Sequence, residues 1–193
     1  MAAATVFKLD PSLPVLLVVG GSKGARSINQ AVLAQLPTLL EMTQVIHITG
    51  QSNREAIETA GERLSLALRK RYQAFPYLHE EMGAALAAAD LVIARAGASA
   101  LGEFTFFGLP AILVPYPHAW RYQKVNADYL AQHGAAIIVN DELLKDELLR
   151  VVTDLLKNPS KRQVMQTAMR SLVRPKAAQA IAEQLLELGG AHK

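Results

Sequence analysis

Two glycine-containing turns have the residue types that bind phosphate groups. Each follows an apolar run that is typical of a buried strand and precedes a segment of helical character. The backbone N–H groups of a helix's first turn have no partner inside the helix and lie at the positive end of its dipole. Glycine lets an anion approach the backbone closely, so the two turns predict a diphosphate site. Its residues are Gly20, Gly21, Ser22, Lys23 and Gly24 in the first turn and Gly97, Ala98 and Ser99 in the second.

Two charged residues flank the second turn in an otherwise apolar setting, where a charged side chain usually needs a partner. Arg95 precedes the turn, and Glu103 follows Ser99 by one helical turn and so shares its helix face. A carboxylate there suits the hydroxyl groups of a ribose, and the whole set then suits a nucleotide sugar. Two alternatives remain: Arg95 and Glu103 form an internal ion pair or cap, and the first turn is only a tight connection in which Ser22 caps the helix.

A third group of polar and aromatic residues follows an apolar run that ends near residue 114. Gln123 and Asn126 are three residues apart, so on a helix both amides face one side and suit sugar hydroxyls. His118 and Tyr122 are further candidate ligand contacts, whereas Trp120 is expected mainly to anchor the loop. This segment therefore predicts the part of the site that holds the sugar.

Other reaction classes lack the residues that they need. The chain has no cysteine, which excludes disulfides, thiolate catalysis and cysteine-bound metals. No histidines have a metal-ligand spacing such as H-E-x-x-H, and His47 is expected in the sheet core. Glu80 and Glu81 are adjacent and diverge on a helix, which does not suit a two-carboxylate glycosidase, and the second glycine turn lacks the G-x-S-x-G pattern. We therefore expect no metal site and no catalytic residue in this chain.

Apolar runs alternate with longer segments of helical period, which is the pattern of βαβ units around a parallel sheet. In such a sheet the loops at the carboxyl ends of the strands gather at one edge, and the candidate residues fall on those loops. We predict an α/β fold, a Rossmann-like parallel sheet of about six strands flanked by helices, with an all-helical C-terminal tail. The expected strands are residues 15–19, 45–49, 72–75, 91–94, 111–114 and 136–139. The expected helices are residues 25–36, 54–68, 80–88, 99–107, 122–133, 141–156, 161–173 and 176–188.

The composition is typical of one soluble globular domain. Of the 193 residues, 51% are hydrophobic and 19% are charged, which provides enough apolar surface for a buried sheet. The net charge of +3 arises from scattered basic residues, which argues against nucleic acid as a partner. The longest apolar stretch, residues 104–117, is interrupted by Gly108, Pro110 and Pro115 and is shorter than the ~20 residues of a membrane span. We expect an N-terminal extension without a secretory signal over residues 1–12, and a single nucleotide-sugar-binding domain over residues 13–193 that includes C-terminal helices over residues 141–188.

Several segments of the chain resemble the MurG family, the transferases that add N-acetylglucosamine to the undecaprenyl-linked muramyl-pentapeptide precursor of peptidoglycan. They read G-G-S-K-G-A-R from residue 20, A-A-A-D-L-V-I-A-R-A-G-A-S from residue 87, G-E from residue 102, G-L-P-A-I-L-V-P-Y-P-H-A from residue 108, and Gln123 with Asn126. They occur in the family's order and resemble its second half over residues 13–140. The resemblance implies one half of a GT-B fold of two Rossmann-like domains, the half that holds most of the donor UDP-N-acetylglucosamine.

The resemblance also implies a role for each candidate residue. The implied contacts are residues 21–24 for the diphosphate, Leu78 and His79 for the uracil, the backbone of residues 97–100 for phosphate and sugar, Glu103 for the ribose, and Gln123 with its neighbours for the N-acetylglucosamine hydroxyls. No cofactor is implied, because the donor is held without a metal. Lys23 stands where the family usually has glutamine, and a cation there adds to the attraction for phosphate.

The family's first half has no counterpart in this chain. In the family, the N-terminal domain carries the lipid acceptor site, the membrane-docking patch and the expected general base, so this chain alone is not expected to transfer sugar. Its implied partners are UDP-N-acetylglucosamine and an N-terminal acceptor-binding domain or subunit, through which alone it reaches the lipid-linked acceptor. The implied location is the cytoplasm, on the inner face of the plasma membrane once the full enzyme is assembled.

Three interpretations remain open. The first is the donor-binding half of a peptidoglycan glycosyltransferase, with inverting displacement at the anomeric carbon when the other half is present. The second is a naturally separate donor-binding subunit, similar to the split N-acetylglucosaminyltransferase of dolichol-linked oligosaccharide synthesis, and the third is a noncatalytic nucleotide-binding module.

The last helix tends in this family to pack on the first domain, so here its apolar residues are expected to be exposed, or covered by self-association with a second copy of the chain: Ile181, Leu185, Leu186 and Leu188.

Overall fold

The described part of this computed structural model forms a sheet of six parallel strands in the order β3-β2-β1-β4-β5-β6. The structure describes residues 3–21, 23–51, 54–118 and 122–190. Each strand lies where the sequence predicts one, and no end differs by more than one residue, so the predicted Rossmann-like fold is confirmed. The strands are β1 (Val15–Val19), β2 (Gln44–Ile48), β3 (Tyr72–Phe75), β4 (Leu91–Ala94), β5 (Ala111–Leu113) and β6 (Ala136–Ile138).

Helices cover both faces of the sheet. One face carries α2 (Arg26–Ala34), α3 (Leu36–Met42) and α9 (Leu144–Lys157). The other face carries α6 (Met82–Ala88), α7 (Ala98–Phe107) and α8 (Tyr122–Gln132). α10 (Pro159–Ser171) packs against both α9 and α7 and so joins the two layers. The remaining elements are α1 (Ala3–Val6), α4 (Arg54–Glu62), α5 (Leu66–Arg69), the 3₁₀ helix η2 (Asp141–Leu143) and α11 (Ala177–Gly190).

The central strand β1 shows why an apolar run predicts this sheet. Leu16 and Val18 lie in the core cluster beside α2 and α9, whereas Val15 and Leu17 lie in the cluster on the opposite face. Successive side chains of a strand point to opposite faces, so a strand between two helical layers must be apolar throughout. β1 pairs in parallel with β2 on one side and β4 on the other, which places its carboxyl end in the middle of the sheet edge.

The helices differ from the prediction in two places. The predicted helix over residues 25–36 is present as α2, but a further helix that was not predicted, α3, begins at Leu36 with Pro37 in its first turn. Proline lacks the N–H that a continuing helix needs, and its ring excludes the carbonyl of the preceding turn, so α2 does not run on into α3. The segment over residues 54–68 divides into α4 and α5, where the Ser65 side chain accepts a hydrogen bond from the N–H of Leu68. The prediction of one helix over residues 54–68 is therefore wrong.

Polar side chains fix the amino ends of the central strands. The Asp90 carboxylate accepts a hydrogen bond from the N–H of Val15 at 2.8 Å. The Gln44 side chain accepts from the N–H of Asp10 at 2.9 Å and donates to the Asp10 carbonyl at 2.7 Å. Phe7 is 4% exposed and belongs to the core cluster on the α6 face. The segment before residue 13, which the sequence suggests is an extension, therefore packs on the sheet.

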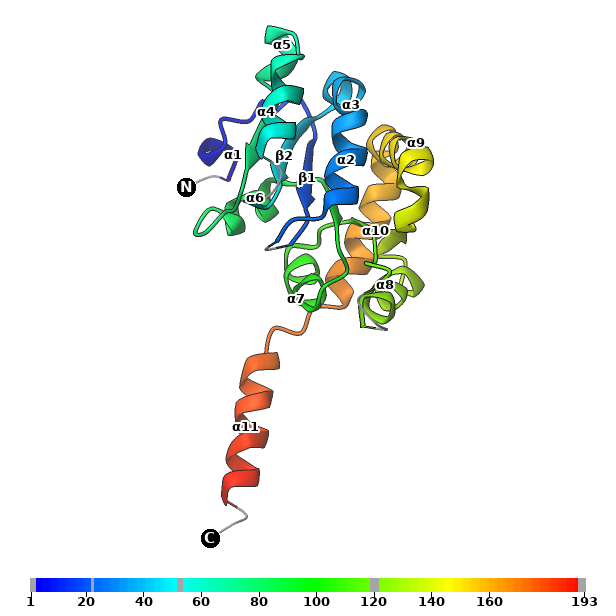
Figure 1. Cartoon of the computed structure of the whole chain (residues 1–193). Coiled ribbons are helices and arrows are strands. Elements are labelled where there is room, and N and C mark those ends of the chain that lie inside the picture. Colours follow the sequence, from blue (N-terminus) through cyan, green and yellow to red (C-terminus); the bar gives the residue numbers. More distant parts are fainter. Residues whose placement is uncertain (1–2, 22, 52–53, 119–121, 191–193) are drawn as a thin grey trace.

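The last helix, α11, extends away from the rest of the chain (Figure 1). Every residue from 174 to 190 is exposed. The apolar side chains of α11 are 60–76% exposed, and they are Ile181, Leu185, Leu186 and Leu188. As expected from the sequence, these side chains find no cover within the described chain.

Candidate functional site

A cavity of about 950 Å³ opens at the carboxyl edge of the sheet. The loops after β1, β4 and β5 form its walls, and its volume suits a ligand of nucleotide size. The fold therefore brings together residues that are far apart in the sequence. The predicted site residues on its walls are Gly20, Gly21, Lys23, Gly24, Arg95, Gly97, Ser99, His118 and Gln123.

The first glycine turn is compact because its glycines touch neighbouring backbone. Gly24 has a φ of +77°, and a Cβ there would lie 2.2 Å from the carbonyl oxygen of Thr49. A Cβ on Gly20 would lie 2.4 Å from the backbone nitrogen of Ala25. Gly21 also has a positive φ, and its carbonyl accepts a hydrogen bond from the N–H of Gly24 at 2.9 Å. No larger residue fits at the Gly20 and Gly24 positions without a shift, so glycine is what lets the turn close at the mouth of the cavity.

Two helices begin at this edge without a side-chain cap. The N-cap residue of α2 is Ala25 and that of α7 is Gly97, and neither makes a side-chain hydrogen bond to the first turn. Ser22, predicted both as part of the site and as an alternative cap, lies outside the described residues. The first N–H groups of such helices are suited to an anion, because no side chain competes for them.

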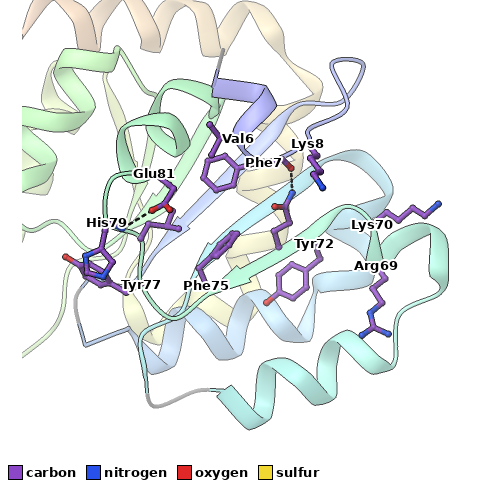
Figure 2. A pocket seen from close by; sticks show the side chains of 12 residues that line it. Val6, Phe7, Lys8, Arg69, Lys70, Tyr72, Phe75, Tyr77, His79 and Glu81 are labelled. Atoms are coloured by element: carbon purple, nitrogen blue, oxygen red, sulfur yellow. Dashed lines mark hydrogen bonds between the residues drawn. The ribbon is translucent and has the colours of Figure 1, made fainter. Parts of the chain in front are cut away.

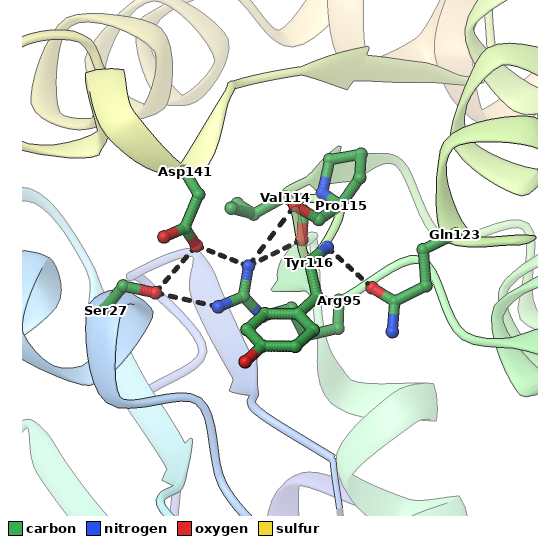
Figure 3. Close-up of polar contacts among 7 residues, drawn as sticks. All are labelled: Ser27, Arg95, Val114, Pro115, Tyr116, Gln123 and Asp141. Atoms are coloured by element: carbon green, nitrogen blue, oxygen red, sulfur yellow. Dashed lines mark hydrogen bonds and ion pairs between the residues drawn. The ribbon is translucent and has the colours of Figure 1, made fainter. Parts of the chain in front are cut away.

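Arg95 is held by other protein groups on the cavity wall (Figure 3). Its Nη1 donates to Asp141 Oδ1 at 2.5 Å and to the Val114 carbonyl at 3.1 Å. Its Nη2 donates to Ser27 Oγ at 2.8 Å, and this hydroxyl donates to the same Asp141 oxygen at 2.7 Å. The side chains of Arg95 and Asp141 are only 12% and 20% exposed. The ionic partner of Arg95 is therefore Asp141, not Glu103 as one alternative from the sequence had it.

The loop after β5 lies over Arg95. The Arg95 Cζ is 5.1 Å from the centroid of the Tyr116 ring, which is a cation–π contact. The N–H of Tyr116 donates to Gln123 Oε1 at 2.9 Å (Figure 3). This bond turns the Gln123 Nε2 group away from Tyr116, and Nε2 has no hydrogen bond with the described residues. Gln123 therefore presents an oriented amide donor at the cavity wall.

The other predicted residues of α7 and α8 are not among the described residues that line the cavity. The Asn126 Nδ2 donates to the Ala96 carbonyl at 3.0 Å and so ties α8 to the second glycine turn. Glu103 lies at the surface of α7, and partial loss of hydration by the surrounding protein raises the pKa of its carboxyl above the ordinary value. Three further positions mark the starts of these helices, and they are Ala98, Ala100 and Tyr122.

Leu78 and His79 line a second cavity, of about 670 Å³, beside β3 (Figure 2). Leu78 is 5% exposed, and the exposed His79 ring lies against Tyr77 with the ring centroids 4.7 Å apart. The loop that carries them follows β3 at the same sheet edge as the glycine turns, two strands away from β1. The structure thus places the expected uracil contacts in a hollow separate from the one lined by the glycine turns.

Three residues that shape the cavity were not selected from the sequence. Ser27 and Asp141 hold Arg95, and Asp141 is 46 residues further along the chain. Only the fold reveals such a pair, because no spacing rule links residues so far apart. Tyr116 lies in the predicted polar segment, but its contact with Arg95 depends on the path of the loop. The remaining residues of this kind on the cavity wall are Ala25, Arg26, Gln30 and Pro117.

The sheet order and the glycine turns at its carboxyl edge define a Rossmann-like domain of the class that binds nucleotides at that edge. Residues 15–185 match the model of the glycosyltransferase family 28 C-terminal domain. The chain therefore belongs to this family.

Similar proteins support the assignment to this family. The UDP-N-acetylglucosamine--N-acetylmuramyl-(pentapeptide) pyrophosphoryl-undecaprenol N-acetylglucosamine transferase of Roseiflexus sp. (strain RS-1) is 44% identical over 201 residues, which cover 94% of this chain and 45% of that protein. The protein of the same name from Moorella thermoacetica is 43% identical over 189 residues, which cover 94% of this chain and 50% of that protein. The crystal structure of Acinetobacter baumannii MurG matches with a TM-score of 0.77 and 29% identity, over 97% of this chain and 53% of that one. The chain spans about half the length of the curated relatives it matches.

Within the described ranges, no helix has the length and apolar character needed to cross a bilayer. The histidine, aspartate and glutamate residues of the same ranges form no group of three or more that could hold a metal ion.

Proposed function

We propose that this chain is the donor-binding half of the transferase that converts lipid I to lipid II in peptidoglycan synthesis, with UDP-N-acetylglucosamine as the donor. The observation that carries the proposal is the cavity at the carboxyl edge, where two glycine turns and the oriented amide of Gln123 face one space of ligand size. A nucleotide sugar has the matching groups, a diphosphate for backbone amides and hydroxyls for side-chain amides. Membership of family 28 and the names of the relatives support this choice.

Each part of the donor has a proposed place. The first glycine turn and the start of α2 bind the diphosphate, and the exposed Lys23 adds positive charge there. The second turn, at residues 97–100, lies beside phosphate and sugar. Leu78 and His79, in the separate hollow at the same sheet edge, bind the uracil, so the proposed donor extends from one hollow to the other. The Nε2 group of Gln123 donates to an N-acetylglucosamine hydroxyl. Arg95 acts as a brace between the loops, because its charge is already balanced by Asp141.

The proposed reaction is a single inverting displacement. The acceptor hydroxyl attacks the anomeric carbon from the face opposite the diphosphate, the bond between that carbon and the β-phosphate oxygen breaks, and UDP leaves. A base must take the hydroxyl proton, and we expect that base in an N-terminal acceptor-binding domain or subunit. The lipid-linked acceptor is reached only through that partner, at the inner face of the plasma membrane. The chain alone is then expected to bind the donor without transferring its sugar.

Calorimetric titration tests donor binding. The chain is titrated, without added metal, with UDP-N-acetylglucosamine, UDP, UDP-N-acetylgalactosamine and ADP-ribose. Binding of the first two in preference to ADP-ribose is the expected result. A ligand that binds only the folded state must stabilise that state. If no nucleotide binds or raises the thermal stability, the interpretation as a noncatalytic module without this ligand is therefore favoured. Adding the N-terminal half of a relative then tests whether transfer to a lipid-linked acceptor appears.

Glu103 provides a test of the ribose contact. The Glu103→Ala change should weaken UDP binding by about 1.5–3 kcal/mol, because it removes charge-assisted hydrogen bonds to the ribose hydroxyls. Burial raises the pKa of this carboxyl, so the affinity for UDP should begin to fall on acidification at a higher pH than for an ordinary glutamate. Calorimetry across this pH range, with Glu103→Gln as the control that lacks a titrating group, checks both statements. An unchanged affinity in Glu103→Ala would mean that the ribose assignment is wrong.

A further inference from the structure

A buried row of polar side chains runs from β3 through β2 to α2. The Tyr72 Oη lies 3.0 Å from His47 Nδ1, and His47 Nε2 lies 3.0 Å from Asn29 Oδ1. The Asn29 Nδ2 donates to the carbonyl of Thr49 at 2.8 Å. His47 is 0% exposed and Asn29 is 1% exposed, so this row lies inside the protein between the sheet and α2. Polar groups are costly in such a place unless each is hydrogen-bonded, and here each one is.

The side chain of Asn29 determines which groups donate and which accept along this row of hydrogen bonds. A carbonyl oxygen only accepts hydrogen bonds, so the Asn29 Nδ2 faces Thr49 and the Asn29 Oδ1 faces His47. That oxygen also only accepts, so the proton of neutral His47 is on Nε2, and Nδ1 accepts from the Tyr72 hydroxyl. Burial lowers the pKa of His47 to about 4, which keeps the ring neutral near pH 7. Every donor in the row therefore points toward the Thr49 carbonyl.

The end of the row lies against the first glycine turn. The Thr49 carbonyl oxygen lies directly against Gly24, because a Cβ added to Gly24 would be only 2.2 Å from it. A Cβ on Gly50 would lie 2.5 Å from both the nitrogen and the Cα of Gly24. The backbone of Thr49 and Gly50 is therefore the surface on which the turn rests. Asn29 itself is on α2, the helix whose start borders the cavity.

We propose that Asn29, oriented by His47, is a positioning residue for the diphosphate site. Its hydrogen bond holds the Thr49 carbonyl at the point where Gly24 packs, and its place on α2 couples the start of that helix to the same point. Asn29 and His47 are buried and act through the backbone rather than by contact with a ligand. This inference rests on the proposed function in one respect only, the assignment of the glycine turn to phosphate.

The matched pair Asn29→Leu and Thr43→Val tests the role of Asn29. Both changes remove a buried side-chain donor to a backbone carbonyl, but the Thr43 hydroxyl bonds to Pro14 at the opposite, amino end of the sheet. Each folded variant is titrated with UDP and with uridine. We expect Asn29→Leu to bind UDP about tenfold more weakly with an unchanged affinity for uridine, and Thr43→Val to bind both as the parent does. Parallel losses for UDP and uridine, or no loss in Asn29→Leu, would overturn the inference.

Two variants of His47 keep the test available if Asn29→Leu does not fold. His47→Gln retains an N–H donor for Asn29, whereas His47→Leu removes it. We expect the ratio of UDP to uridine affinity to be retained in His47→Gln and to fall in His47→Leu. Equal ratios in the two variants would contradict the proposed role of His47.

Hydrogen exchange gives a measurement that needs no ligand. The N–H of Gly24 donates to the Gly21 carbonyl, and the N–H of Gly50 donates to the Pro76 carbonyl. In Asn29→Leu or His47→Leu these two amides should exchange faster than in the parent chain, while amides of β4 and β5 keep their protection. If the parent chain binds no UDP, the proposed function and the assignment of the turn to phosphate fail. The exchange rates then decide whether Asn29 positions the glycine turn, and unchanged rates at Gly24 would overturn that role.

Discussion

The glycine-turn edge and the C-terminal helix differ in how they are held. At the edge, Arg95 makes hydrogen bonds to groups from three separate segments, and the first turn packs against the Thr49 and Gly50 backbone. In α11, by contrast, every residue is exposed, including four large apolar side chains. One region is fixed by contacts within the described chain, and the other has an apolar surface that the described residues do not cover.

The cavity edge is therefore stabilised by contacts inside the domain, whereas the apolar face of α11 would need cover from outside the described chain. The described residues of the loops that line the cavity are held by hydrogen bonds and by close backbone packing within the domain. An exposed apolar helix adds little to the stability of the domain, because the hydrophobic effect needs apolar area to be removed from water. Substitutions at the edge should therefore lower the free energy of unfolding, whereas substitutions in α11 should leave it nearly unchanged.

The strongest test of the tightly held edge is a pair of glycine substitutions. Gly24→Ala should lower the free energy of unfolding by about 3 kcal/mol, because it combines a positive φ with a clash against the Thr49 carbonyl. Gly21→Ala should cost about 1 kcal/mol, because Gly21 also has a positive φ but has nothing within 4 Å of the added Cβ. Urea unfolding measures both values. Equal costs for the two variants would show that the turn does not rest on Thr49 as described.

A pH experiment tests the buried row behind the same edge. His47 has a pKa of about 4 in the folded protein because of burial, against about 6.5 when unfolded. Between these values the unfolded chain binds a proton that the folded chain does not, so stability is fully present above pH 6.5 and declines as the pH falls toward 4. The loss should reach about 3 kcal/mol. Urea unfolding of the parent and of His47→Gln at pH 7 and pH 4.5 isolates this contribution, which should be missing in the variant; equal pH slopes would contradict it.

The Arg95–Asp141 pair allows a comparison with a surface ion pair. Arg95→Ala should lower the free energy of unfolding by about 2 kcal/mol, because Asp141 then keeps only its bond to Ser27 in a mostly buried place. Lys124→Ala serves as the control, since the Lys124–Asp128 pair is exposed and should contribute less than about 0.5 kcal/mol. Thermal or urea unfolding distinguishes them. Similar small effects would mean that Arg95 does not brace the loops.

The smallest effect is expected for α11. Removal of residues 174–193 should change the free energy of unfolding of the remaining domain by less than about 0.5 kcal/mol, because none of residues 174–190 is buried. Sedimentation of the full and shortened chains tests the further expectation that the apolar face of α11 mediates self-association. A large loss of stability in the shortened chain, at a concentration where both are monomeric, would show that α11 packs on the domain.

Much of the fold could be predicted because its signals are local. The six strands of the described chain follow from apolar runs bounded by glycine, proline and polar residues, and these runs are a direct result of burial on both faces. The helix α3 and the helix break at Ser65 were missed, because an apolar period alone does not mark where one helix ends and the next begins. Local periodicity reports which side of a segment is buried and is a weaker guide to where a helix stops.

The candidate site also has some residues that the sequence could predict and some contacts that it could not. The glycine turns and Gln123 were found, since turn residues and helical spacing mark them, and the cavity brings them together. The pairing of Arg95 with Asp141 and the bond from Asn29 to Thr49 join segments 46 and 20 residues apart. No pattern in the sequence links such residues, so these contacts required the structure. The roles assigned to individual residues toward a ligand remain predictions.

The hydrogen bonds at the amino ends of the strands lie in a part of the domain whose sequence can vary independently of the glycine turns. Asp90 and Gln44 tie β1 and its lead-in segment at the end of the sheet opposite the glycine turns. A five-residue strand such as β1 is about 16 Å long, so the two ends are farther apart than the range over which substitutions usually interact. Natural variation or engineering at the amino end can therefore adjust thermal tolerance while ligand preference is selected independently at the other end.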